Sequence, residues 1–338
     1  MNVTVCYTPA AALPPETPPA LPPFTSPDST QAAREAAKAL QTLGHRPVLL
    51  PVTDDLQLLL RELKLARPKV IVNLAGGLQG DGRRHLHTAA LLDFTGIPYT
   101  GAAPNGLALA QDKARTKDIL LRHGLPTPRY HLVKVNDQFP KLRDLAWPLL
   151  VKPRFGQGCR GIACDSVVTN ERELQRAVRA LHDRFQLGAL IEEYVEGREI
   201  HATLLGNTEH QFLPPVEVRY APDLPRPIYT EAQQANRRPD GIELVAPATL
   251  LKREEFLLRD LVLRVARLLE SRDYLRVDIR LRDGLPYIID VNANPSLAAG
   301  GSVLRAAQAA RLSLPRLLEQ LLRYALERAP AAASAPGS

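Results

Sequence analysis

The stretch Tyr274-Leu-Arg-Val-Asp-Ile-Arg-Leu-Arg-Asp-Gly-Leu-Pro-Tyr-Ile-Ile-Asp-Val-Asn-Ala-Asn-Pro-Ser296 carries the clearest structural signal in the chain. Apolar and polar residues alternate from Leu275 to Leu281, which is typical of a half-buried strand. Asp283-Gly284 is a strong signal for a tight hairpin turn, and a mostly apolar run follows from Tyr287 to Val291. The sequence therefore predicts two antiparallel strands joined by a short turn.

Polar side chains of this hairpin are expected to converge. Arg276 and Asp278 share one face of the first strand, and Asp290 and Asn292 share one face of the second. A register that pairs the strands through the turn can bring all of them together. Oxygen ligands without histidine or thiolate suit Mg²⁺ or Mn²⁺, so Asp278, Asp290 and Asn292 are candidate metal ligands. The alternative is a solvated hairpin with ordinary surface charges.

The composition indicates a folded protein of two or three packed units, with 338 residues, 45% apolar and 23% charged. The net charge of +7 comes from scattered arginines without long basic runs, so no nucleic-acid partner is expected. Cys6, Cys159 and Cys164 form neither a disulfide framework nor metal-ligand spacing, which favours a reducing compartment. No signal peptide and no membrane-spanning run is recognisable, so we expect a cytoplasmic protein without a membrane partner.

The N-terminal part alternates strands and helices, which predicts a parallel α/β sheet. The expected strands are Val3 to Tyr7, Pro47 to Leu50 and Lys69 to Leu74, and the expected helices run from Ser29 or Thr30 to Leu43 and from about Asp55 to Leu65.

A second unit begins near a helix expected from Asp112 to His123. A strand from Trp147 to Lys152, a glycine-rich loop and a strand from Ile162 to Asp165 predict a hairpin whose glycines let backbone N–H groups approach phosphate oxygens. The later expected elements are a helix from Glu171 to Phe185, paired strands at Ala189 to Tyr194 and Glu199 to Leu205, and a helix near Leu314 to Glu327.

Several segments, in order along the chain, resemble the D-alanine:D-alanine ligase family of ATP-grasp enzymes and its close relatives. They are Gly96-Ile-Pro-Tyr-Thr-Gly101, Asp112-Lys-Ala-Arg-Thr-Lys117, Gly124-Leu-Pro-Thr-Pro128, Pro148-Leu-Leu-Val-Lys-Pro153, Glu192-Glu-Tyr-Val-Glu-Gly-Arg-Glu199 and Arg276-Val-Asp278 with Asp290-Val-Asn292.

The resemblance implies an α/β and α+β fold with three domains and ATP bound between the last two. We expect an N-terminal parallel-sheet (pre-ATP-grasp) domain over residues 1–102, a central ATP-grasp subdomain over 103–191, a C-terminal one over 192–329 and a disordered tail over 330–338. It also implies a homodimer that makes an amide or peptide bond from small amino-acid or carboxylate substrates, through an acyl phosphate, as in peptidoglycan synthesis. ATP and two Mg²⁺ or Mn²⁺ ions would be required.

The resemblance also assigns roles to individual residues. Lys113 and Lys152 match the phosphate-binding lysines, and the loop with Gly156, Gly158 and Gly161 matches the phosphate-covering loop in position. Glu192 and Glu199 match the adenine-side and ribose-binding carboxylates, although Glu193 is an alternative to Glu192. Asp278, Asp290 and Asn292 become the metal ligands. Arg276 would stabilise the oxyanion, and Ser302 would meet the substrate carboxylate.

The departures from the family pattern concern substrate recognition more than ATP binding. The N-terminal glycine-rich turn and substrate-binding glutamate are missing, and Asp28 is the available replacement. A family histidine is absent from Asn73-Leu-Ala-Gly-Gly77, although His85 and His87 follow. Gln233 stands in place of a cation that Arg237 or Arg238 would have to supply, Asp290 stands in place of glutamate, and Cys159 in place of a small hydroxyl residue.

Three classes of function remain open at this stage. The first is an ATP-dependent ligase for D-alanine or for another carboxylate and amine pair. The second is an ATP-binding regulator that has lost ligation, which Gln233 and Asp290 suggest and the retained Arg276 opposes. The third is a dinucleotide-dependent oxidoreductase, which the missing Gly-x-Gly-x-x-Gly motif disfavours.

Overall fold

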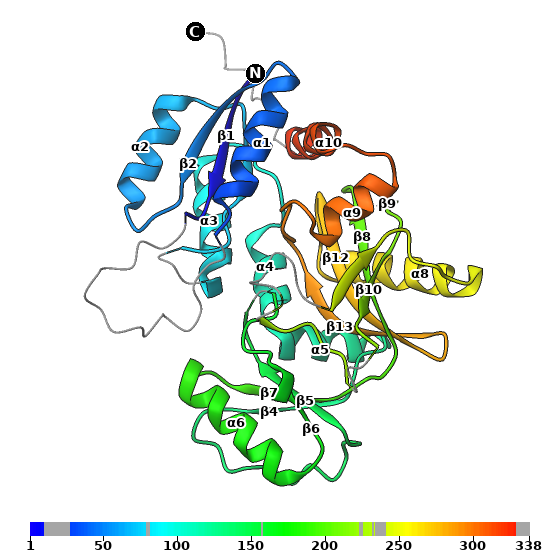
Figure 1. The fold of residues 1–338 in the computed structure, drawn as a ribbon. Helices are drawn as coiled ribbons and strands as arrows, with labels where there is room; N and C mark the ends of the chain where they lie inside the picture. The colour runs from blue at the N-terminus through cyan, green and yellow to red at the C-terminus, as the bar shows by residue number, and fades with distance from the viewer. Residues whose placement is uncertain are drawn as a thin grey trace.

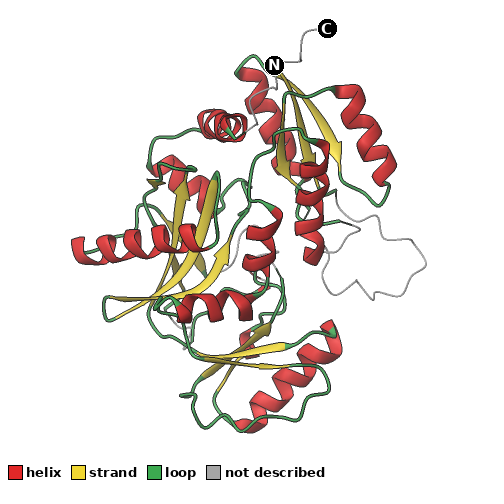
Figure 2. Ribbon diagram, turned by 180° about the vertical axis from the view of Figure 1, so that it is seen from behind, coloured by secondary structure: helices red, strands yellow, loops and turns green. Residues whose placement is uncertain are grey.

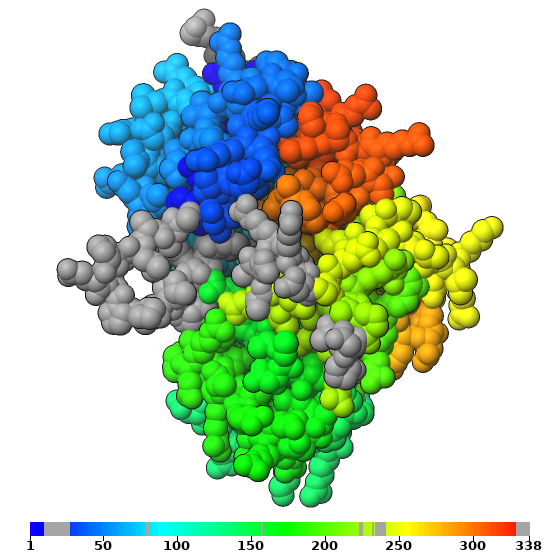
Figure 3. Space-filling view, in the orientation of Figure 1, coloured from blue at the N-terminus to red at the C-terminus, as the bar shows by residue number. Residues whose placement is uncertain are grey.

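A computed structural model describes residues 1–9, 28–78, 82–156, 158–222, 226–231, 233 and 241–328. The chain forms three parts. In Figure 1 the N-terminal part lies at the top and the central part at the bottom. The C-terminal sheet lies between them. Figure 3 shows the N-terminal residues in blue against the C-terminal residues in orange on one face of the molecule.

The N-terminal part contains the predicted parallel sheet, in the order β2-β1-β3. Its strands are β1 (Asn2–Tyr7), β2 (Arg46–Pro51) and β3 (Val70–Leu74), and its helices are α1 (Thr30–Thr42), α2 (Leu56–Ala66) and α3 (His85–Thr95), preceded by the short η1 (Gly82–Arg84). Val3 and Val5 pack with α1 and with the C-terminal helix α10 (Leu314–Glu327). Cys6 faces the other way, toward the core that contains residues of α2 and α3. The central strand β1 is therefore buried on both faces.

The central part is a 4-stranded sheet in the order β4-β7-β5-β6. The strands are β4 (Tyr130–Val133), β5 (Leu149–Pro153), β6 (Val167–Val168) and β7 (Ala189–Glu193), with η2 (Cys164–Ser166) just before β6. Helix α6 (Glu171–Phe185) packs on one face through Leu174, Val178 and Leu181. The Asn170 side chain accepts a hydrogen bond from the Glu173 N–H at 3.0 Å and so fixes the start of this helix.

The C-terminal part is a 6-stranded sheet in the order β11-β10-β8-β12-β13, with β9 paired to β8. Its strands are β8 (Arg198–Leu205), β9 (Gln211–Phe212), β10 (Val216–Tyr220), β11 (Ile242–Val245), β12 (Tyr274–Arg282) and β13 (Leu285–Asn292). The predicted hairpin is β12–β13, and its turn residues Asp283 and Gly284 both have positive φ, at 52° and 75°. This is the backbone that a tight hairpin requires.

One face of this sheet is apolar and the other polar. Ile200, Ala202 and Leu204 of β8 share a core with Leu258 and Val262 of α8 (Lys252–Leu268). Because side chains alternate along a strand, the residues between them point away from α8. Figure 2 shows α8 lying along one face of the sheet. The opposite face is left to carry the polar residues of β8, β12 and β13.

Three further helices connect the parts. Helices α4 (Pro104–Gln111) and α5 (Lys113–Arg122) lead from the first sheet to the second, and α9 (Ser302–Ala309) follows β13. Sequence patterns did not predict α4 as a separate helix. Asp112, between α4 and α5, accepts a hydrogen bond from the Arg115 N–H at 3.3 Å and is paired with Arg154 at 2.7 Å. No helix within the described ranges is long and apolar enough to span a bilayer.

Two local expectations were wrong. The strands at Ala189–Glu193 and Arg198–Leu205 do not pair with each other, because β7 joins the central sheet and β8 the C-terminal sheet. The strand that returns to β5 after the glycine-rich loop is Val167–Val168, whereas Cys164–Ser166, which overlaps the end of the expected strand, forms a 3-10 turn. In both cases neighbours in sequence were assumed to be neighbours in a sheet. The expected tail at 330–338 lies outside the described residues.

Candidate active site

A cavity of about 650 Å³ lies between the central and C-terminal sheets. Its walls come from β5 and β7 on one side and from β8, β12 and β13 on the other, with the start of α9 closing one end. The predicted site residues on its wall are Lys113, Lys152, Gly158, Glu192, Glu199, Arg276, Asp278, Asp290 and Ser302. Gly156 and Asn292 line an adjoining cavity of about 500 Å³, and Gly161 lines neither. Residues from distant parts of the sequence thus meet at one place.

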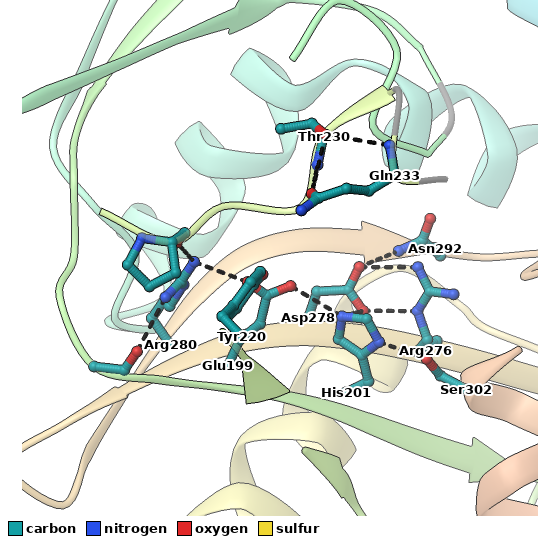
Figure 4. Close-up of polar contacts among 12 residues, drawn as sticks. Glu199, His201, Tyr220, Thr230, Gln233, Arg276, Asp278, Arg280, Asn292 and Ser302 are labelled. Atoms are coloured by element: carbon teal, nitrogen blue, oxygen red, sulfur yellow. Dashed lines mark hydrogen bonds and ion pairs between the residues drawn. The ribbon is translucent and has the colours of Figure 1, made fainter. Parts of the chain in front are cut away.

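The polar face of the β12–β13 hairpin forms a hydrogen-bonded group, as Figure 4 shows. Arg276 donates two hydrogen bonds to Asp278, from Nε to Oδ1 at 2.7 Å and from a terminal nitrogen to Oδ2 at 2.9 Å. Asn292 Nδ2 donates to the same Oδ2 at 3.0 Å. Burial favours the neutral acid, but the charges of Arg276 and His201 and the hydrogen bonds from Arg276 and Asn292 together lower the pKa of Asp278. Asp278 is therefore held as a carboxylate.

The hairpin offers a donor set that fits a divalent metal ion. Asp290 lies directly opposite Asp278 in the strand register, and Arg276 lies opposite Asn292. Among the described residues, no three His, Cys, Asp or Glu side chains form a metal site by themselves. Mg²⁺ is commonly bound by one or two carboxylates, with substrate phosphates and water completing its coordination. Two carboxylates and an amide oxygen fit that mode of binding.

Both predicted phosphate-binding lysines reach from the central part of the chain to β13. Lys113, the first residue of α5, contacts Asp290 Oδ1 at 2.9 Å and the Gly156 carbonyl at 3.1 Å. Lys152 of β5 donates to the Ile289 carbonyl at 2.9 Å. Their ammonium groups therefore lie beside the candidate metal ligands. A phosphate chain in this cavity would therefore meet cations and carboxylates close together.

Glu192 is fully buried between two lysines. Its carboxylate lies 2.6 Å from Lys152 Nζ and 2.8 Å from Lys117 Nζ. Burial opposes its ionisation, but the two ammonium groups outweigh burial and lower the pKa of Glu192. Burial also lowers the pKa of Lys117 to about 8. Glu193, the alternative candidate, is instead paired with the exposed Arg129. Of the two neighbouring glutamates, Glu192 is therefore the buried one.

Glu199, on β8 at the wall of the same cavity, is held by several donors. The Tyr220 hydroxyl donates to Oε2 at 2.6 Å, and the Arg280 guanidinium lies 2.9 Å from the same oxygen. Burial opposes ionisation, but Arg280 and His201 outweigh it and lower the pKa of Glu199. His201 Nε2 lies 3.1 Å from Oε1. The residue predicted to bind ribose is thus a fixed carboxylate.

The glycine-rich loop is tied to the segment that precedes Gln233. The Gly161 N–H donates to Glu231 Oε2 at 3.0 Å, and the Glu231 N–H donates to the Ile162 carbonyl at 2.9 Å. The Gly161 N–H is thus bonded to the Glu231 carboxylate in this structure, and the phosphate contact expected for this loop stays a prediction. A side chain at Gly161 would collide with Pro153, since a Cβ would lie 2.6 Å from its ring.

Cys159 lines the main cavity but is poorly suited to act as a nucleophile. Burial, and then the nearby carboxylates of Glu199 and Asp278, raise the pKa of its thiol. A raised pKa disfavours the reactive thiolate. This agrees with the sequence, which shows no histidine arrangement near Cys159.

The residues that differ from the family pattern lie at several places around the cavities. Gln233 accepts hydrogen bonds from the Thr230 N–H and hydroxyl at 3.0 and 2.9 Å, and so caps its own turn. Arg237 and Arg238 lie outside the described residues. Asp28 lines both cavities, and its carboxylate accepts from the Thr30 N–H at 2.9 Å. His85 is buried, with Nε2 3.2 Å from Asn294 Nδ2.

Sequence reasoning missed several residues of this site, above all His201, Lys117 and Glu231. The alternation Glu199-Ile-His-Ala-Thr203 places His201 on the same strand face as Glu199, and this signal could have identified it. Lys117 ends one of the quoted motifs, but nothing in its spacing predicts a contact with Glu192. Glu231 depends on how two loops meet, which no local pattern shows.

Comparisons with known proteins agree with this geometry. A family model described as the D-ala D-ala ligase C-terminus matches residues 119–323. A protein of Sinorhizobium fredii, called the uncharacterized protein y4sG, is 33% identical over 303 residues and covers 88% of each chain. A D-alanine–D-alanine ligase of Desulforudis audaxviator is 30% identical over 305 residues, which is 89% of this chain and 94% of the relative.

The fold is similar to that of a solved D-alanine–D-alanine ligase from Bacillus anthracis complexed with ATP. The TM-score is 0.75 with 20% sequence identity, and the match covers 97% of this chain and 98% of the other. A second structure from the same organism gives a TM-score of 0.76 with 19% identity. The predicted fold, with its N-terminal parallel sheet, is confirmed.

Proposed function

This chain belongs to the D-alanine–D-alanine ligase family of ATP-grasp enzymes, and we propose that it joins two small amino acids through an acyl phosphate made from ATP. It is an ATP-dependent ligase that forms a carbon–nitrogen bond. D-alanine in both positions, as for peptidoglycan synthesis, is the first pair to test. One observation supports the proposal most directly: cations, carboxylates and an arginine from separate elements line a single cavity.

The residues of the cavity suit the steps of such a reaction. Lys113 and Lys152 can hold the phosphate chain, because both ammonium groups already reach β13. Arg276 can stabilise the negative charge that develops on the carbonyl oxygen during phosphorylation and amine attack. Glu199 can accept hydrogen bonds from ribose hydroxyls, and Glu192 from the adenine amino group.

Asp278, Asp290 and Asn292 would hold the metal ion or ions. A bound Mg²⁺ or Mn²⁺ would neutralise charge on the phosphates during transfer. Lys113 and Arg276 now neutralise Asp290 and Asp278, respectively.

The proposal places the enzyme in the cytoplasm as a homodimer. The composition and the cysteine pattern support this location, and the family resemblance supports the dimer. Light scattering during size-exclusion chromatography would measure the mass against the 37.2 kDa of one chain.

The test is ADP release by the purified protein in Mg-ATP with D- and L-amino acids and small carboxylates, with products identified by mass. Hydroxylamine should be added in parallel, because it traps an acyl phosphate as a hydroxamate and so identifies the carboxylate substrate without the amine. D-alanine-dependent ADP release with D-alanyl-D-alanine formation would support the first pair. Another active pair would redirect the substrate assignment.

A regulator that binds ATP without ligation is the second candidate. Gln233 favours it, because its side chain caps a turn at a position where the family pattern has a cation. Tight ATP binding with no ADP release and no hydroxamate on any carboxylate would support this candidate and contradict the ligase.

A further inference from the structure

His201 joins two residues of the site that come from different elements. Its Nδ1 lies 2.6 Å from the Ser302 hydroxyl, and its Nε2 lies 3.1 Å from Glu199 Oε1. Ser302 begins α9, whereas Glu199 and His201 lie on the same face of β8. Figure 4 shows the ring between these two side chains. All three are nearly inaccessible to solvent, with exposures of 3% for His201 and 5% for each of the others.

The two partners depend on His201 to different degrees. Glu199 keeps Tyr220 and Arg280 as donors whether or not the imidazole is present. For the Ser302 hydroxyl, the only hydrogen bond among the described residues is the one to His201. Nε2 also lies 3.7 Å from Asp278 Oδ1, so this edge of the ring faces two carboxylates. Loss of the ring would leave Glu199 held but would free the rotation of the Ser302 hydroxyl.

We propose that His201 is a positioning residue that fixes the Ser302 hydroxyl toward the amino-acid substrate and anchors it to the ribose-side carboxylate. The inference rests on the proposed ligase function, because it assigns Ser302 to the substrate end of the cavity. A carboxylate can only accept hydrogen bonds, so Nε2 must carry a proton, and Nδ1 is the nitrogen that holds Ser302. A hydroxyl fixed before binding does not have to be ordered by the substrate.

Two amide variants separate the edges of the ring. In His201→Asn the amide occupies about the position of Nδ1, so the contact with Ser302 can be kept. In His201→Gln the amide reaches about the position of Nε2, so the contact with Glu199 can be kept and the one with Ser302 is lost. If His201 merely filled space, the smaller Asn would be more harmful than Gln, which is the opposite of what the Ser302 contact predicts. The pair therefore tests which contact matters.

We expect His201→Gln to raise the KM for the amino acid about tenfold and to change the KM for ATP less than about twofold. Ser302→Ala should do the same, and the double variant should be no worse than either single one, because both remove the same contact. His201→Asn should stay within about threefold of the wild type. An Asn variant that is worse than the Gln variant, or additive effects in the double variant, would overturn the proposal.

A measurement without turnover keeps the inference separate from the proposed function. The ¹⁵N resonances of the His201 ring report which nitrogen carries a proton, and Ser302→Ala should shift the Nδ1 resonance. If the wild type has no activity on any substrate pair, the ligase proposal fails. An Nδ1 resonance that is unchanged in Ser302→Ala would separately overturn the contact between His201 and Ser302. Hydrolysis of p-nitrophenyl acetate that disappears in both Ser302→Ala and His201→Gln would also overturn it, because Ser302 would then be a nucleophile.

Discussion

At the scale of single residues, two neighbours of the Asp290 carboxylate support its role as a metal ligand close to the phosphates. It lies opposite Asp278 in the hairpin register and 2.9 Å from the Lys113 ammonium group. Asp290→Asn removes the charge but keeps the shape. We expect kcat/KM to fall at least about 100-fold, because an amide binds Mg²⁺ far less well than a carboxylate does and leaves phosphate charge less neutralised.

The matched control for Asp290→Asn is Asp283→Asn in the turn of the same hairpin. Asp283 is exposed, and Asn tolerates its φ of 52°. Steady-state kinetics over a range of Mg²⁺ concentrations, with circular dichroism of all three proteins, would check the prediction. Normal turnover in Asp290→Asn would remove this residue from the metal site.

His85 should make the folded state sensitive to acid. Burial lowers its pKa from 6.5 to about 4. Above pH 6.5 the histidine is neutral in both the folded and the unfolded chain, so its stabilising effect is complete there. Between pH 6.5 and 4 the unfolded chain binds a proton that the folded chain does not, so the free energy of unfolding falls as the pH falls. At pH 5 the loss is about 2 kcal/mol.

Urea unfolding of the wild type and of His85→Gln at pH 8, 6.5 and 5 would measure this loss. Glutamine keeps an acceptor near Nε2 for Asn294 but cannot be protonated, so its free energy of unfolding should fall less with pH. His123→Gln is the control, because His123 is exposed. Parallel curves for wild type and His85→Gln would show that His85 does not account for the acid sensitivity.

At the scale of elements, the turn between β7 and β8 lets the chain leave one sheet and enter the other. Gly197 in this turn has φ +128°, and a Cβ there would lie 2.3 Å from the Leu281 carbonyl oxygen. Gly197→Ala should cost more than about 2 kcal/mol, because an L-residue is strained at this φ and the clash is with the backbone of β12.

Gly44→Ala is the matched control for Gly197→Ala. Gly44 also has a positive φ, +76°, but a Cβ there would meet nothing within 4 Å. Its cost should therefore stay near 1 kcal/mol, from the backbone alone. Equal destabilisation of the two variants in urea would contradict a steric origin for the larger effect.

The elements also show what the sequence can predict. The β12–β13 hairpin was predictable, because alternation and turn residues act within a few positions. The partners of β7 and β8 were not, because a Gly-containing turn between two strands does not determine whether both strands join the same sheet. His201 contacts Ser302 across 101 positions in sequence. Such contacts depend on the packing of α9 against the sheet, which local patterns do not encode.

At the scale of the whole molecule, a division at 102/103 and 191/192 remains our proposal for the domains. One helix of the third domain, however, packs on the first. Helix α10 lies at the C-terminal end of the chain and packs on the N-terminal sheet, as Figure 1 shows. Arg328, just after α10, donates to the Tyr99 carbonyl at 2.9 Å and is paired with the buried Asp273. The N-terminal sheet therefore needs the C-terminal segment to complete its core.

This dependence predicts that a chain ending at Arg311 will not fold stably. It lacks α10, whose Leu317, Leu318, Leu321 and Leu322 are fully buried, and each such side chain contributes about 1.5–3 kcal/mol. The apolar side chains of α1 and β3 that pack against α10 would be exposed. A chain ending at Arg328 keeps all these contacts and is the control. Size-exclusion chromatography and thermal unfolding of both chains would test this prediction. A monodisperse chain ending at Arg311 with an unchanged melting temperature would show that the N-terminal part is independent of α10.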